Sequence, residues 1–214
     1  MTVDLWCAPE IYLAVVGDDV VVLDVAGDHY HCLLDTAALL RPDASGRIVA
    51  ADALIAEELR TAGLAGDAAS NPERRPVILP IRELAPAPHP PRMEMVRAGL
   101  AWIVAAIIFR RKPLSVLVEY RRSERDKPHE LDVTRLADLL GAARSVRSWI
   151  PFEGECLQRS FQLRCYLASR GVAADWLFGV RTWPFSAHCW LQIGDLVVGD
   201  RLERVRRYTP ILRA

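Results

Sequence analysis

Three residues in the second half of the chain have side chains and spacing that suit nucleophilic chemistry. Cys156 follows Gly154 and Glu155, where a helix is expected to begin, and the unpaired amides of a helix start favour a thiolate over a thiol. His188 lies on an expected strand and Asp200 follows the next strand. Adjacent antiparallel strands can place both on one face, where Asp200 would fix the imidazole's orientation and tautomer. The expected chemistry is acyl transfer through a thioester.

The same residues also allow a structural interpretation. A cysteine at a helix start often fills a core, and a histidine on a strand is often an ordinary hydrogen-bonded residue. Asp195 is a second candidate for the acid, although it follows Ile193 and Gly194 in an expected hairpin turn, where aspartate is favoured for structural reasons. Spacing alone therefore leaves the nucleophile and its acid open.

Two further cysteines are expected to lie away from Cys156. Cys165 is nine residues further along the helix, about 900° round its axis, so it should face the opposite side and pack into the core. Cys189 neighbours His188 on a strand and should point to the other face. These three thiols and the imidazole would not converge on one zinc ion, so we expect no metal and no other cofactor.

The elements that position these residues are expected in the second half of the chain, where helices precede antiparallel strands. This order is typical of an α+β fold. The apolar run over residues 98–109 is twelve residues long, which is too short to span a bilayer and is typical of a buried helix. The expected helices cover residues 93–111, 132–146 and 155–170, and the expected strands cover residues 173–181, 187–193 and 196–199.

The first part of the chain is expected to form its own module. Short β-branched segments separated by Gly-Asp turns over residues 11–33 predict a three-stranded antiparallel meander. Small helices are expected at residues 36–40 and 49–61, which would complete a winged-helix-like module. Seven prolines over residues 72–91 predict a semi-rigid linker. We therefore expect a module of residues 1–66, a linker of residues 67–92 and a second domain of residues 93–214.

Charge and cysteine content narrow the choice of partner and compartment. Residues 1–64 contain eleven acidic side chains against three arginines and no lysine, although the whole chain has a net charge of zero. Such an acidic module lacks the cations that phosphate binding needs, so we expect a peptide partner and no nucleic acid. Five cysteines without a C-x-x-C pair favour reduced thiols in the cytoplasm. The first residues contain no basic and apolar signal-peptide pattern, and no membrane insertion is expected.

Four motifs follow one another in the second half of the chain: Cys156-Leu157-Gln158-Arg159-Ser160, Gly179-Val180-Arg181, Ala187-His188-Cys189-Trp190 and the later Asp200. They occur in the order found in one family. This part of the sequence resembles the transglutaminase-like (papain-like) cysteine leader peptidase of lasso peptide biosynthesis, the C-terminal half of the family's fused B protein. The resemblance implies that Cys156, His188 and Asp200 are the catalytic triad. It favours Asp200 over Asp195, because the family carries its acid after the last strand.

A weaker resemblance covers residues 1–64, which are similar to the family's precursor-recognition domain. Such domains bind a leader peptide as an added strand, which here would lie beside residues 29–34 and against a helix near residues 51–61. The expected leader-binding residues are His29, Tyr30, His31, Cys32 and Leu33.

Together the two resemblances imply a cysteine peptidase that binds a ribosomally synthesised precursor and removes its leader. The family further implies a partner cyclase, similar to asparagine synthetase, that closes the macrolactam. Two alternatives remain: another acyl-transfer enzyme of the transglutaminase-like fold, and a carrier that binds the leader without cutting it.

Overall fold

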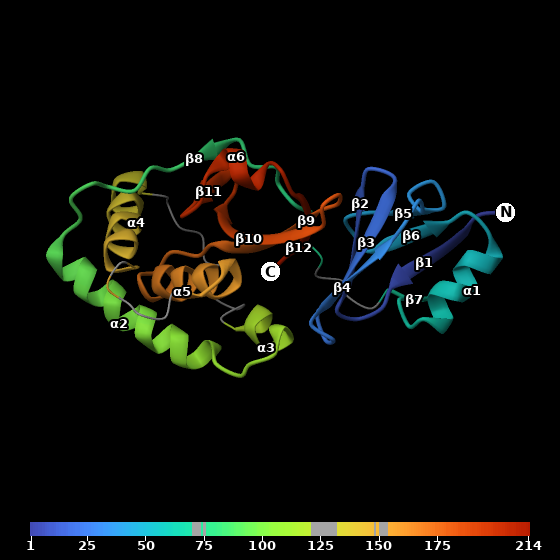
Figure 1. Cartoon of the computed structure of the whole chain (residues 1–214), viewed down its shortest axis with the longest axis horizontal. Helices are drawn as coiled ribbons and strands as arrows, with labels where there is room; N and C mark the ends of the chain where they lie inside the picture. The colour runs from blue at the N-terminus through green and yellow to red at the C-terminus, as the bar shows by residue number, and fades with distance from the viewer. Residues whose placement is uncertain (70–73, 75, 121–131, 148, 150–153) are drawn as a thin grey trace.

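The computed structural model describes residues 1–69, 74, 76–120, 132–147, 149 and 154–214. The molecule is elongated, with a β-rich part at one end and a larger part of helices and a second group of strands at the other (Figure 1). The β-rich part contains the N-terminus, and the helical part follows it in the chain.

The β-rich part contains two small antiparallel sheets and one helix. One sheet has the order β2-β3-β4, which confirms the predicted meander, and the other has the order β5-β6-β1-β7. The elements are β1 (Val3–Cys7), β2 (Ile11–Val16), β3 (Asp19–Asp24), β4 (His29–Leu33), β5 (Leu40–Pro42), β6 (Arg47–Ala50), α1 (Ala53–Thr61) and β7 (Ala65–Gly66).

The small helices expected here are largely wrong. No helix forms at residues 36–40, because Leu40 is buried and begins β5, which pairs with β6. The second helix begins four residues later than expected. Residues 47–50 form β6 against β1, and Asp52 then caps α1 by accepting a hydrogen bond from the amide of Ile55 at 3.0 Å. The winged-helix arrangement is therefore not confirmed for this part of the chain.

The larger part has the predicted α+β order, with a five-stranded sheet of order β12-β9-β10-β11-β8. Helix α5 packs against β9 and β10, and α2 packs against α5 and α4. Its elements are β8 (Arg82–Glu83), α2 (Arg92–Phe109), α3 (Leu114–Glu119), α4 (Val133–Arg147), α5 (Cys156–Ser169), β9 (Asp175–Arg181), β10 (Ser186–Ile193), β11 (Leu196–Val198), α6 (Leu202–Val205) and β12 (Thr209–Arg213).

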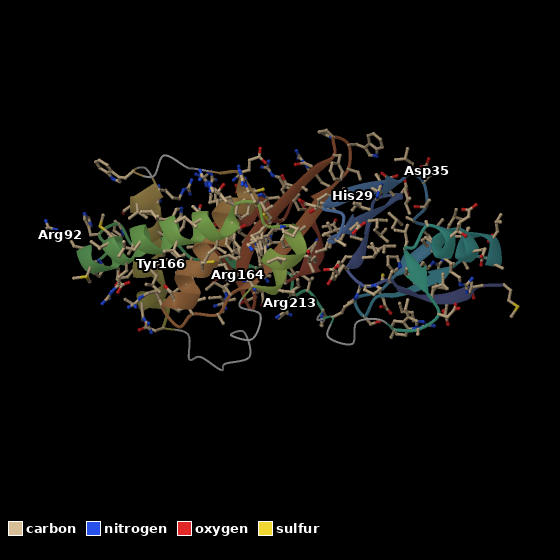
Figure 2. All side chains as sticks on the ribbon, turned by 90° about the horizontal axis from the view of Figure 1, so that it is seen from below. His29, Asp35, Arg92, Arg164, Tyr166 and Arg213 are labelled. Carbon is tan, nitrogen blue, oxygen red and sulfur yellow. The ribbon has the colours of Figure 1, made fainter. Side chains whose placement is uncertain are left out.

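Helix α5 is the central element of this part. Tyr166 and Arg164 of α5, both labelled in Figure 2, contact different elements. The Tyr166 hydroxyl donates to the carboxylate of Glu94 on α2 at 3.3 Å, and the Arg164 guanidinium lies 5.5 Å from the ring centre of Trp176 on β9. Helix α5 is thereby held between α2 and the sheet, which fixes the position of its first residue.

Helix α2 differs from the fully buried helix that its apolar run predicts. Trp102 and two alanines are buried against the core, whereas Leu100 and Ile107 are 61% and 66% exposed. The helix is apolar all round, so its periodicity could not show which face the core would cover. Within the described ranges, no helix has the length and apolar character needed to cross a bilayer.

Part of the expected linker lies along the second part of the molecule. Residues 70–73, with Pro72, and residue 75 lie outside the described residues. Further on, Arg82 and Glu83 form β8, a short parallel partner of β11. The side-chain amide of Gln192 donates to the carbonyl of Ile78 at 2.7 Å. Residues 78–83 of this segment are therefore bound to the sheet.

The two parts share a core where β2 meets β12. Val21 and Leu23 of β3 are completely buried in the same apolar cluster as Trp176. The indole of Trp183 donates to the buried carboxylate of Asp19 at 2.8 Å. A module that contributes buried residues to a shared core is not a freely tethered unit, so the two parts are best studied in the full chain.

Candidate active site

Cys156 is the first residue of α5, as predicted from the sequence. Glu155 occupies the cap position, but its side chain accepts no capping hydrogen bond. The first-turn amides therefore have no side-chain acceptor at the cap and can favour negative charge on the adjacent sulfur or on a bound oxyanion. The Cys156 side chain is half-buried, which keeps the thiol accessible to a substrate.

The strand next to this helix start has an open edge. β11 pairs with β10 only at Leu191, Gln192 and Ile193, so the edge of β10 beside His188 and Cys189 is not covered by β11. The chain leaves β11 at Gly199, which has a φ of +76°. A Cβ atom there would lie 2.3 Å from the Leu163 side chain, so both the turn and the close packing require glycine.

The turn at Gly199 brings Asp200 to His188. The Asp200 Oδ2 atom lies 2.6 Å from the His188 Nε2 atom, and its Oδ1 atom accepts the Arg201 amide at 2.8 Å. Because Asp200 engages Nε2, the other ring nitrogen, Nδ1, is left to face Cys156. Both side chains are largely buried, at 9% and 15% exposure, which strengthens a charged contact of this kind.

Asp195, the alternative acid, has a different partner. Its carboxylate accepts three hydrogen bonds from Arg82, at 2.5, 3.0 and 3.1 Å. The backbone carbonyl of Asp195 also accepts the amide of Ile81 at 3.0 Å. The carboxylate therefore fastens β8 to the hairpin turn, and the geometry places Asp200 alone of the two acids beside His188.

The surroundings of Cys156 stabilise its thiolate. The pKa of Cys156 falls to about 4, chiefly because the Cys189 thiol and the His188 ring hydrogen-bond to the sulfur, and these effects outweigh burial. For His188, burial alone would lower the pKa, but the hydrogen bonds and charges of Asp200 and Cys156 raise it to about 9. At neutral pH the favoured state is therefore a thiolate beside an imidazolium, which suits nucleophilic attack.

Cys189 is a contributor to the site that the sequence argument set aside. Alternation along β10 does separate its side chain from that of His188, but the sulfur of Cys156 lies at the open strand edge rather than over one face. It accepts hydrogen bonds from both the Cys189 thiol and the Cys189 backbone amide, and the same contact raises the pKa of Cys189. The short β11 that leaves this edge open could not be anticipated from alternation.

Ser160 connects the helix start to the sheet. Its hydroxyl donates to the Cys156 carbonyl at 2.7 Å and accepts the indole N–H of Trp176 at 2.8 Å. The Cys189 sulfur lies 3.3 Å from the same hydroxyl oxygen. Ser160 therefore supports the positions of both sulfur atoms. Cys165, in contrast, is buried in the core on the opposite side of α5, as predicted.

A cavity of about 860 Å³ opens onto these side chains, and Cys156, His188 and Asp200 all line it. Trp102, Leu140 and other apolar residues form part of its wall. The arrangement combines an activated thiolate, a proton donor and a volume that fits several residues of a peptide. Chemically, it is suited to acyl transfer from an amide.

The comparison with protein families agrees with this geometry. The pattern of the transglutaminase-like superfamily matches residues 98–213, which contain α5, β9 to β12 and the residues Cys156, His188 and Asp200. The chain belongs to the transglutaminase-like superfamily.

Similarity to one characterised protein is more local. The Microcin J25-processing protein McjB of Escherichia coli is 41% identical over 49 residues, which cover 23% of this chain and 24% of that protein. The match therefore spans about a quarter of the relative's length. No solved structure matches this transglutaminase-like protein.

The residues expected to bind a leader lie on β4, an edge strand of its sheet. His29, His31 and Cys32 are exposed, and Leu33 packs against the core of the β-rich part. Tyr30 points toward the transglutaminase-like domain. Its ring lies 5.8 Å from that of Phe185, and burial together with the charges of Cys189 and Cys156 raises its pKa. This edge strand therefore extends to the vicinity of the candidate nucleophile.

The helix expected to share leader binding is placed differently. Helix α1 packs against β1, β6 and β7, which belong to the other sheet of the β-rich part. The predicted groove between this helix and β4 is therefore not formed. Of the expected leader-binding residues, Tyr30 is the one that packs on the transglutaminase-like domain, against Phe185.

Proposed function

We propose that this transglutaminase-like protein is a cysteine peptidase that removes the leader from a ribosomally synthesised lasso peptide precursor. The observation that carries the proposal is the arrangement of Cys156, His188 and Asp200 at the open edge of β10. The edge strand β4, whose Tyr30 lies close enough to Cys156 and Cys189 to sense their charges, supports a peptide substrate. The local similarity to a microcin-processing protein supports the class of substrate.

In this mechanism the Cys156 thiolate attacks the carbonyl carbon of the scissile bond and forms a tetrahedral oxyanion. Amides at the start of α5 stabilise that oxyanion. The His188 imidazolium gives its proton to the leaving amine, the C–N bond breaks, and a thioester remains. Neutral His188 then takes a proton from water, whose oxygen attacks the thioester and releases the leader as a carboxylic acid. Asp200 holds the ring throughout.

The free amine produced by this reaction is the group that a macrolactam-forming enzyme needs. The family resemblance supports a partner cyclase similar to asparagine synthetase, which would use the new amine of the core peptide. Recognition by β4 and cleavage at Cys156 within one chain, whose two parts share a core, would hold the scissile bond near the thiolate once the leader is bound.

Product analysis tests the proposal. The purified full chain is incubated with a candidate precursor, synthesised from a short reading frame beside its gene, and with the fluorescent amine monodansylcadaverine. We expect mass spectrometry to find a leader fragment ending in a free carboxylate and a core fragment with a new amine. Amine incorporation without hydrolysis would favour a transglutaminase, and tight binding with an intact precursor would favour a carrier.

The recognition strand gives a separate prediction. Changing the exposed His31 to Asp should weaken leader binding about tenfold, or about 1.4 kcal/mol, because the added strand contacts side chains along this edge. The measurement is fluorescence anisotropy of a labelled leader with the full chain. Leu54→Asp is the matched control, because Leu54 is 71% exposed on α1. Equal losses in both variants would argue against β4 as the binding edge.

A further inference from the structure

The cavity at Cys156 has an unusual excess of positive side chains. Among the described residues, six arginines and three carboxylates line it. The arginines come from separate segments of the chain: Arg144 and Arg147 from α4, Arg159 from α5, and Arg201, Arg204 and Arg207 from α6 and its flanks.

Two of these three carboxylates already accept hydrogen bonds from groups other than the arginines. Asp200 bonds to His188 and lies 3.8 Å from Arg204, and Glu83 accepts the Leu202 amide at 2.6 Å. Glu203 is an exposed residue of α6. Within the described part of the chain, these carboxylates therefore form no ion pair with Arg144, Arg201 or Arg207.

Three of these arginines form no ion pair that would stabilise the described part of the fold. Arg144, Arg201 and Arg207 are exposed, and their side chains form no ion pair within the described part of the chain. The proposed mechanism does not use them either, since a neutral amide, a thiolate and an imidazolium need no additional cations. Exposed guanidinium groups around a reactive cavity instead suit an anionic ligand, because their planar N–H groups match a carboxylate.

We propose that this arginine-walled cavity binds an acidic side chain of the substrate peptide close to the scissile bond, with Arg144 and Arg207 as specificity determinants. This proposal rests on the proposed peptidase function. Trp102, Leu140 and Leu163 supply the apolar surface that packs on the rest of the peptide. A small acidic residue beside an apolar one fits such a mixed wall better than an extended polyanion.

The first experiment measures the charge preference of the cavity without requiring cleavage. Cys156 in the full chain is alkylated with iodoacetate, which is anionic, or with iodoacetamide, which has nearly the same shape and no charge. We expect the iodoacetate-to-iodoacetamide rate ratio to fall about threefold in Arg144→Gln and about tenfold in Arg144→Gln/Arg207→Gln, as expected for nearby charges at a hydrated surface.

Arg92→Gln is the matched control, because Arg92 is an exposed arginine at the far end of α2 (Figure 2) and does not line the cavity. Its rate ratio should equal that of the wild type. Comparison between variants also removes the contribution of the His188 imidazolium, which is present in all of them. An unchanged ratio in the double variant would overturn the proposal.

The second experiment identifies the ligand as a substrate side chain. One glutamate is moved through the three positions on each side of the cleavage site of the precursor, with glutamine as the neutral partner at each position. At one position or more we expect kcat/KM to be at least about fivefold higher for glutamate, and this preference should vanish in the double variant.

The two experiments separate the two proposals. No cleavage of any precursor by the wild type would count against the peptidase function, while the alkylation ratio would still decide whether the cavity selects anions. Normal cleavage with no glutamate preference at any position would overturn the specificity proposal even if the alkylation ratio behaved as expected.

Discussion

Replacing Cys156 by alanine should abolish leader removal and leave leader affinity unchanged. The variant lacks the only group in the proposed mechanism that forms a bond to the scissile carbonyl, while β4 and its surroundings are untouched. We expect the cleavage rate to fall at least about 10⁴-fold, since amides and binding alone supply only weak residual catalysis. The measurement is the amount of leader released over time, read by mass spectrometry, with leader affinity measured by anisotropy.

Cys165→Ala is the matched control for this prediction. It removes a thiol from the same helix, but from the side that packs into the core, so it should retain most of the cleavage rate and lose only some stability. Persistent cleavage by Cys156→Ala would show that the nucleophile lies elsewhere. Cys189 would then be the first residue to test, because its sulfur lies in the same hydrogen-bonded group.

The local features of the site were the most predictable from sequence. The start of α5 at Cys156 follows from a Gly-Glu pair before an amphipathic run, and its end follows from Gly171, which has a φ of +76°. The nearness of His188 to Asp200 follows from the order of two short antiparallel strands. Each of these signals is local in the sequence, so elementary rules of helix termini and strand alternation are enough to predict these features.

The features that the sequence missed depend on distant pairing. Residues 47–50 form a strand because β6 pairs with β1, more than forty positions earlier in the chain, and residues 40–42 form β5 by pairing with β6. Tertiary pairing of this kind overrides local propensity. The role of Cys189 depends on where β11 stops, and the arginine-walled cavity gathers residues from positions 144 to 207. A count of arginines in the second half of the chain would have hinted at a basic surface but not at its location.

The coupling of the three residues explains why the acid should matter as much as the thiol. The Cys156 thiolate and the His188 imidazolium stabilise each other, so a change in the pKa of His188 also changes the pKa of Cys156. Asp200 maintains this state through its 2.6 Å contact with the far side of the ring. Loss of the Asp200 charge would therefore both free the orientation of the His188 ring and raise the pKa of Cys156.

Changing Asp200 to Asn should therefore lower the cleavage rate about 10³- to 10⁴-fold, whereas Asp195→Asn should change it less than about threefold. The amide keeps the shape of the carboxylate but not its charge, so the ring loses the group that holds its orientation and tautomer. Asp195 lies on the outside of the hairpin and bonds to Arg82. The measurement is kcat/KM for the precursor with both variants; a larger loss in Asp195→Asn would reverse our choice of acid.

The pH profile distinguishes this role from simple loss of structure. Cleavage needs the thiolate, which forms as the pH rises through about 4, and the imidazolium, which is lost as the pH rises through about 9. The wild-type profile should therefore be bell-shaped between these limits. Because the Asp200 charge raises the pKa of His188, the Asn variant should lose activity at a lower pH on the alkaline side. The pKa of Cys156 should also rise, because His188 with a lower pKa is less often protonated and its positive charge then stabilises the thiolate less. A profile of unchanged width and reduced height would indicate that Asp200 only maintains the fold.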